Sequence, residues 1–167
     1  DFAIRYSRTA SEVFCEPDAK LIEYFWSHVW AEVDARFFAW LESSYSGLHN
    51  LPASPPVMQH HIPKQLNRFR AKGARVALIL LDGMSISGWH TILPVLKSKM
   101  KTEFRMETSG VFSWLPSLTP ICRQSAFSGL APRLFEATID RTDRDGARWK
   151  EFWEANGELR PSQISHL

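Results

Sequence analysis

The sequence predicts an α/β fold, with a mainly parallel sheet flanked by helices and a helical segment before it. The main observation is the run RVALILL at residues 75–81, which is nearly all apolar and lacks polar alternation. Such a run is typical of a strand that is buried on both faces. The patterns that follow indicate a helix, a second strand and another helix, an order expected of parallel strands joined by crossovers. A chain of 167 residues with 44% hydrophobic residues is long enough to form one core.

A long helix is predicted near the start of the chain. Pro17 opens a helix that runs from residue 18 to about residue 46, because apolar side chains recur there at every fourth position. These positions are Leu21, Phe25, Val29, Val33 and Phe37. Further aromatic residues widen the apolar surface, so we expect the helix to need packing partners on two sides.

A domain boundary is predicted after this helix. Gly47 is expected to end the helix, and residues 47–61 contain three prolines that indicate a loop or linker. His60 and His61 are interpreted as loop histidines. We therefore divide the chain into a helical lead-in with linker, residues 1–61, and a second domain, residues 62–167.

The second domain begins with alternating helices and strands. An amphipathic helix at residues 62–72 precedes the 75–81 strand, and Ser85 or Ser87 caps a helix that Pro94 kinks or restarts. One or two strands are expected at residues 103–108 and 110–114, with Gly110 as the break. A helix from Thr119 to Gly129 follows, and a last helix begins at Asp143 or Asp145 and ends at Gly157. Trp149, Phe152 and Trp153 fall on one side of that last helix.

Thr119 is the first candidate site residue. It is predicted to be the N-cap of its helix, with Pro120 as the first helical residue. Its hydroxyl then lies at a positive helix end, where the amides of Ile121 and Cys122 favour an anion such as phosphate or an alkoxide. An ordinary helix cap is the alternative interpretation.

Asp82 is the second candidate, because it follows the 75–81 strand directly. Open α/β sheets bind ligands beyond the carboxyl ends of their strands, and Gly83 allows the backbone to turn tightly there. The alternative interpretation of Asp82 and Gly83 is a simple turn.

Composition excludes several other classes. The longest apolar run is far shorter than a membrane span, and Cys15 and Cys122 have no metal-type spacing, so we expect a cytoplasmic location. The net charge of +2 does not by itself indicate nucleic-acid binding. A basic cluster at residues 64–75 is interpreted as a solvated face, with phosphate or nucleic-acid contact as the alternative. The chain starts at Asp1, which suggests a piece of a larger protein.

Several segments together resemble a known family. The DGM sequence after an apolar run, and the Pro-Ser-Leu-Thr segment that opens a helix, resemble the alkaline phosphatase superfamily. More narrowly, Thr119 followed by Arg123 and Gln124, with Arg-Trp-x-x-Phe-Trp at residues 148–153, resembles the PglZ domain of bacterial BREX-type phage-defence systems. The resemblance runs from about Arg75 to the end of the chain.

This resemblance implies an alkaline-phosphatase-like, metal-dependent phosphohydrolase, of which this chain would be the amino-terminal part. Asp82 would be a metal ligand and Thr119 both ligand and nucleophile, with two divalent ions, zinc or else manganese or magnesium. The remaining ligands would lie beyond Leu167, so the 167-residue fragment alone is expected to be inactive. Arg123 would contact phosphate, with a structural ion pair as the alternative.

The resemblance also implies partners. The substrate would be a phosphodiester or phosphomonoester in a nucleotide or nucleic acid, and other defence proteins such as a DNA methyltransferase would be partners. No membrane partner is expected. A non-catalytic interaction or regulatory module of a defence complex, which keeps the fold, is the alternative function.

Overall fold

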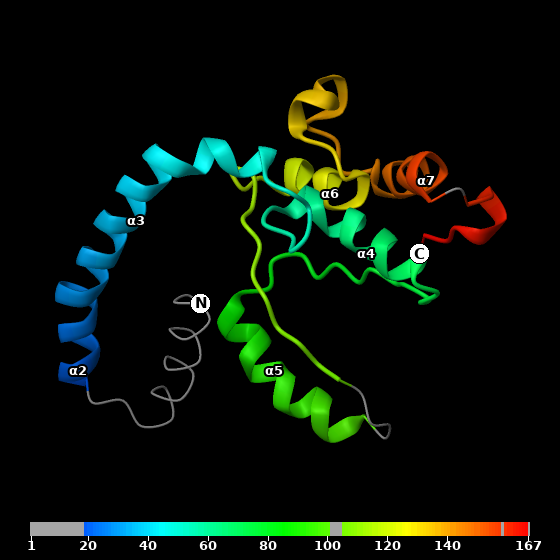
Figure 1. Ribbon diagram of the computed structural model, residues 1–167. Helices are drawn as coiled ribbons and strands as arrows, with labels where there is room; N and C mark the ends of the chain where they lie inside the picture. The colour runs from blue at the N-terminus through cyan, green and yellow to red at the C-terminus, as the bar shows by residue number, and fades with distance from the viewer. Residues whose placement is uncertain (1–18, 101–104, 158, 167) are drawn as a thin grey trace. The chain divides into compact units, whose positions relative to one another are not determined.

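The computed structural model describes residues 19–100, 105–157 and 159–166. In this part of the chain, helices are joined by extended segments and turns, and no sheet is present (Figure 1). The predicted α/β fold with a parallel sheet is therefore wrong for the described residues. The positions predicted for Pro17, Cys15 and the start of the 103–108 strand lie outside them.

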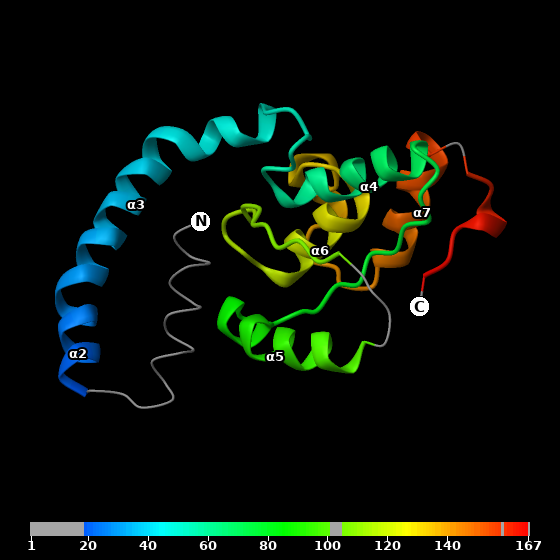
Figure 2. The ribbon, with the colours of Figure 1, turned by 60° about the horizontal axis from the view of Figure 1, so that its bottom comes forward.

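The segment at residues 75–81 shows why the sheet prediction failed. Its backbone is extended but pairs with no other strand of the described chain, as the uninterrupted coil between α4 and α5 in Figure 2 illustrates. Val76, Leu78 and Leu80 are half-buried, whereas the alternate residues Ile79 and Leu81 are 82% and 57% exposed. An apolar run indicates a segment whose side chains favour burial. A sheet also needs a neighbouring strand that accepts and donates backbone hydrogen bonds.

The predicted strands before Thr119 are also absent from the described residues. Residues 105–111 are extended without a ladder partner. One isolated parallel bridge joins Phe112 to Met58. A single bridge fixes the local path of the chain without making a sheet.

The chain divides into two compact units, residues 1–46 with 80–110 and residues 47–79 with 111–167. In the first unit, helix α2 (Ala19–Tyr24), the π-helical segment η1 (Phe25–Trp30) and helix α3 (Ala31–Ser44) follow one another without a break. The 3-10 helix η2 (Tyr45–Asn50) continues past Gly47, so that glycine does not end the helical region as predicted.

Helix α5 (Ile86–Lys99) completes the described helices of the first unit. The Gly88 amide donates to the Ser85 hydroxyl at 3.0 Å, so of the two predicted caps, Ser85 and Ser87, Ser85 is the one used. The helix continues through Pro94 rather than restarting there. Neither α3 nor α5 contains a fully buried residue.

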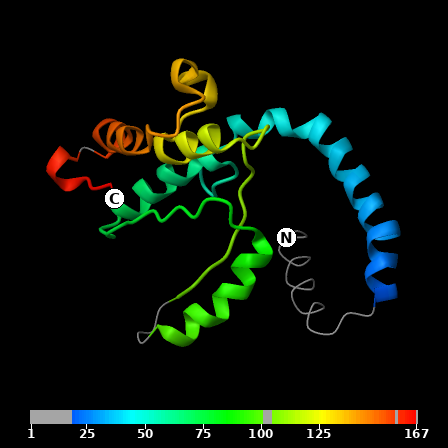
Figure 3. The ribbon, with the colours of Figure 1, turned by 180° about the vertical axis from the view of Figure 1, so that it is seen from behind.

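The second unit contains the main core of the described chain. It is built from α4 (Ile62–Ala71), α6 (Thr119–Ser128) and α7 (Asp145–Asn156), with 3-10 turns η3 (Gln59–His61), η4 (Pro132–Leu134), η5 (Glu136–Thr138) and η6 (Pro161–Gln163). Helix α6 lies against both α4 and α7, and Figure 3 shows the three together from behind. The buried apolar side chains are Leu48, Met58, Ala126, Phe127, Phe135, Trp149, Phe152 and Trp153.

The ends of these helices agree with the sequence pattern. Gly129 ends α6 in a left-handed conformation, with φ of 69°, and its amide donates to the Ser125 carbonyl at 3.0 Å. A Cβ atom at this position would lie 3.0 Å from the Phe152 ring and 3.3 Å from Pro63. Glycine is therefore required both for the conformation and for the close approach of α6 to α7 and α4. Gly157 caps α7 as predicted.

Candidate functional site

Thr119 is the first residue of α6 and not its cap. The N-cap is Leu118, whose extended backbone places its carbonyl to accept the first helical hydrogen bond, from the Cys122 amide at 2.9 Å. Pro120 therefore occupies the second helical position. The predicted cap is one residue later than the observed one, a difference common at helix ends because the terminal turn is only partly hydrogen-bonded. The Thr119 side chain is exposed.

Because Leu118 and not Thr119 is the N-cap, the anion site predicted at the start of α6 changes in part. The Cys122 amide is used within the helix, so it does not contribute to an anion site. The Ile121 amide remains in the first turn, where amides have no intrahelical acceptor. The helix dipole still places partial positive charge beside the Thr119 hydroxyl.

The segment before Thr119 is anchored to the core of the second unit. The Gln59 amide donates to the Phe112 carbonyl at 3.0 Å, and the Phe112 amide donates to the Val57 carbonyl at 2.8 Å. Two residues later, the Trp114 ring packs 5.2 Å from the His60 ring. The chain that leads to Thr119 is thus held at one end, while Leu118 beside Thr119 is exposed.

Arg123, one turn after Thr119, joins α6 to the start of α7. Its Nε and Nη2 atoms donate to Oδ2 of Asp145 at 2.7 and 2.5 Å. The Asp145 side chain is only 4% exposed and that of Arg123 33%. Asp145 was predicted as a possible cap, but it is the first helical residue of α7 and its carboxylate forms this ion pair. The contact favours the structural role that the sequence offered for Arg123 beside phosphate binding.

Gln124 is the centre of a buried polar network that the sequence pattern did not reveal. Its side chain is fully buried, and Nε2 donates to the carbonyls of Thr138 and Arg141 at 2.6 and 3.0 Å. Its Oε1 accepts from the Thr138 hydroxyl at 3.1 Å and from Arg148 Nε at 3.3 Å. The side-chain amide therefore fixes the loop between α6 and α7 at several points.

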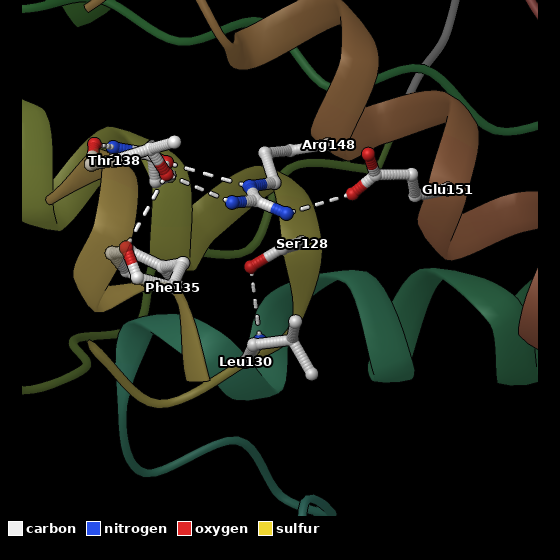
Figure 4. Close-up of polar contacts among 7 residues, drawn as sticks. Ser128, Leu130, Phe135, Thr138, Arg148 and Glu151 are labelled. Atoms are coloured by element: carbon white, nitrogen blue, oxygen red, sulfur yellow. Dashed lines mark hydrogen bonds and ion pairs between the residues drawn. The ribbon is translucent and has the colours of Figure 1, made fainter. Parts of the chain in front are cut away.

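Arg148 closes this network from α7, as the close-up in Figure 4 shows. Its Nη2 donates to the Thr138 hydroxyl at 2.9 Å, and its Nη1 donates to Glu151 at 2.8 Å. The guanidinium also lies over the Phe135 ring, 5.6 Å from its centre. Gln124 and Arg148, two of the residues that carried the family resemblance, thus contact each other and join α7 to the helix that begins with Thr119.

His60 and His61 were interpreted as loop histidines, but both are buried in η3, at 3% and 2% exposure. His61 Nδ1 accepts from the amides of Val57 and Met58 at 3.1 and 3.3 Å, so this nitrogen is unprotonated. Burial lowers the pKa of His60 to about 4, and the nearby charges of His61 and Lys64 add to the effect. Burial and then Lys64 also lower the pKa of His61.

Asp82 lies in a turn with Gly83, whose φ of 71° is left-handed. The side chain is exposed. Asp82 belongs to the first unit and Thr119 to the second, so their convergence in one site stays a prediction. Among residues 19–100, 105–157 and 159–166, no three His, Cys, Asp or Glu side chains gather as a metal-binding group.

The two residues are chemically suitable for part of a metal site. Carboxylate and hydroxyl oxygens suit hard divalent cations, and carboxylates also bind zinc. Zinc takes about four ligands, so Asp82 and Thr119 alone would not complete a zinc site. In the same described part, no helix is long and apolar enough to cross a membrane.

Comparison with known proteins identifies a family. The model of the BREX system PglZ alkaline phosphatase-like domain matches residues 58–147, which is more than half of the chain. The match includes Asp82, Thr119, Arg123 and Gln124. No curated protein and no solved structure matches the chain.

Proposed function

Since the chain belongs to the PglZ family of alkaline phosphatase-like domains of BREX defence systems, we propose that it carries the nucleophile of a metal-dependent phosphohydrolase. Thr119 is that nucleophile, and the substrate is a phosphoester in a nucleotide or nucleic acid. The observation that carries the proposal is the placement of Thr119, an exposed hydroxyl in the first turn of a helix that its neighbours hold firmly.

The proposed reaction has two steps at phosphorus. The Thr119 oxygen forms a bond to phosphorus while the ester oxygen of the substrate leaves, giving a phospho-threonine or nucleotidyl-threonine. Water then attacks phosphorus and releases the threonine oxygen. A threonine hydroxyl is a weak nucleophile near neutral pH, and a bound divalent cation would supply the charge that stabilises its alkoxide.

The residues of this chain contribute orientation and local charge. The first turn of α6 offers the Ile121 amide and the positive end of the helix to the developing negative charge. The ion pair of Arg123 with Asp145 and the contacts of Gln124 fix α6 against α7, so the Thr119 hydroxyl keeps its position. Asp82 would hold a metal ion, zinc or else manganese or magnesium.

The experiment uses the longest natural protein that contains this chain, with bis-p-nitrophenyl phosphate and added zinc, manganese or magnesium. Thr119→Ala is expected to reduce hydrolysis to background while circular dichroism and melting stay unchanged. Thr119→Ser, which keeps a hydroxyl, is expected to retain part of the activity. Ser117→Ala is the matched control, because it removes an exposed hydroxyl two residues earlier.

Asp82→Ala is expected to weaken metal binding and hydrolysis together, measured by calorimetric metal titration and by rate. The 167-residue chain alone is expected to show no turnover, because two donors cannot complete a zinc site. Unchanged hydrolysis by Thr119→Ala would contradict the proposal. A natural protein that hydrolyses no phosphoester would favour the alternative, a non-catalytic module that associates with other defence proteins.

A further inference from the structure

The part of the chain around α4 has an unusual distribution of charge. No Asp or Glu occurs between Glu42 and Asp82, whereas five Lys or Arg residues lie in that interval. The whole chain, with 20 basic and 18 acidic residues, is nearly balanced. The excess positive charge is therefore concentrated on one short stretch of the second unit.

Three of these cations form one stripe along α4. Lys64 and Arg68 lie four residues apart on one side of α4, and Lys72, the C-cap residue directly after the helix, continues this spacing. All three are exposed. We call these three residues the basic stripe. Along an α-helix they span about 12 Å, at about 1.5 Å per residue. Arg75 follows in the extended segment and is also exposed.

Other residues of α4 attach the helix to the rest of the unit. Pro63 is buried, and Asn67 Nδ2 donates to the Asn156 carbonyl at 2.8 Å. Arg70 Nη2 donates to the Gly157 carbonyl at 2.5 Å, and the Arg70 guanidinium lies 5.9 Å from the Trp153 ring centre. Arg70 thus forms contacts within the unit, whereas the basic stripe is exposed at the surface.

The basic stripe also lacks acidic partners. Within the described chain, none of Lys64, Arg68 and Lys72 forms an ion pair. Around α6 and α7 the pattern is opposite, because carboxylates pair with the basic side chains there. These pairs are Arg123 with Asp145, Arg141 with Asp143, Arg148 with Glu151 and Lys150 with Glu154.

Helix stability explains only part of the stripe. Cations near the carboxyl end of a helix, such as Arg68 and Lys72, are favoured by its dipole. Lys64 lies instead in the first turn, where the dipole disfavours a cation, and its charge lowers the pKa values of the buried His60 and His61. The helix dipole therefore does not account for the position of Lys64.

We propose that the basic stripe binds the sugar-phosphate backbone of a nucleic acid. Phosphates follow one another closely along a strand, so three cations over about 12 Å can each contact one, whatever the base sequence. Phe69, beside the stripe, is 46% exposed and can stack on an unpaired base. This surface differs from the Thr119 site, and its binding does not depend on hydrolysis.

The test measures binding of fluorescently labelled 20-nucleotide single-stranded and 20-base-pair double-stranded DNA by anisotropy, in the presence of EDTA and at several salt concentrations. The stripe variant carries Lys64→Gln, Arg68→Gln and Lys72→Gln. The control variant carries Arg133→Gln, Lys150→Gln and Arg160→Gln, which removes three exposed charges from the same unit. Circular dichroism checks that both variants keep their helix content.

For the unchanged chain, a plot of the logarithm of the binding constant against the logarithm of the salt concentration is expected to have a slope of about −2 to −3, the value for three phosphate contacts. The stripe variant should lose at least tenfold in affinity at low salt and most of that slope, whereas the control variant should lose less than threefold. Phe69→Ala should weaken binding of the single strand only. Equal losses in the two variants, or binding of poly-glutamate with no binding of either DNA, would overturn the proposal.

Discussion

Helices α6 and α7 of the second unit and the continuous run α2, η1 and α3 of the first unit both carry aromatic side chains, but among the side chains that the structure describes these are buried only in the second unit. The aromatic residues of α7 are buried against α6 and one another, with Trp149, Phe152 and Trp153 each below a tenth exposed. In the first unit, Trp26, Phe37 and Phe38 remain about half exposed. An aromatic stripe therefore does not make a core; it makes one only where another helix supplies the opposite face.

Charged side chains show the same contrast. The Arg123–Asp145 pair is largely removed from solvent, whereas the Arg36–Glu32 pair on α3 is exposed on both sides. A buried pair leaves an uncompensated charge when one partner is removed, and an exposed pair leaves a solvated one. The comparison thus predicts that equivalent substitutions will have different costs in the two units.

The largest difference is expected for aromatic truncation. Phe152→Ala should reduce the free energy of unfolding by about 3 to 5 kcal/mol, because it removes a ring that contacts Gly129 and Trp153. Phe38→Ala, the same change at a side chain that is 60% exposed, should cost no more than about 0.5 kcal/mol. Urea unfolding followed by tryptophan fluorescence measures both. Similar losses in the two variants would mean that α3 is also packed against a partner.

The next largest effect expected is a pH dependence of the free energy of unfolding of the second unit. The folded pKa of His60 is about 4 against an ordinary 6.5, so the unfolded chain binds more protons between these values. Neutral His60 therefore contributes to the free energy of unfolding above about pH 6.5, and this contribution is lost as the pH falls toward 4. Each pKa unit corresponds to about 1.4 kcal/mol, so the loss can reach about 3 kcal/mol.

His60→Phe is expected to flatten this decline, because the replacement ring carries no titratable group. Unfolding free energies of the unchanged chain and the variant should be compared at several values from pH 7 to pH 4. His28→Gln, at an exposed histidine of η1, is the control and should leave the slope as it was. If His60→Phe leaves the pH dependence of the unfolding free energy unchanged, His60 is not the group that causes the decline.

The smallest difference is expected for the ion pairs. Arg123→Ala should cost about 1 to 3 kcal/mol, because it leaves the buried Asp145 carboxylate without its donor. Arg36→Ala should cost about 0 to 1 kcal/mol. Thermal melting of both variants, with Asp145→Asn as a further test, measures this. A loss from Arg123→Ala that is no larger than the loss from Arg36→Ala would contradict a structural role for the buried pair.

The local pattern of the sequence was sufficient for several helix ends and for the family, although it placed the start of α6 one residue late. Gly129, Gly157 and Ser85 ended or capped helices as predicted, because glycine conformation and a capping hydroxyl act within a few residues. The side of α7 that carries Trp149 and Trp153 is buried as expected. The segments around Thr119 also indicated the PglZ family, which the family match confirmed.

Only the tertiary structure decided which segments found partners. The apolar run at residues 75–81 predicted a buried strand, yet in the described chain it pairs with nothing, since sheet formation depends on a second strand far along the sequence. The burial of His60 and the pairing of Arg123 with Asp145 likewise depend on residues that are not neighbours in sequence. Periodicity and caps are local properties, whereas burial and charge pairing belong to the packed molecule.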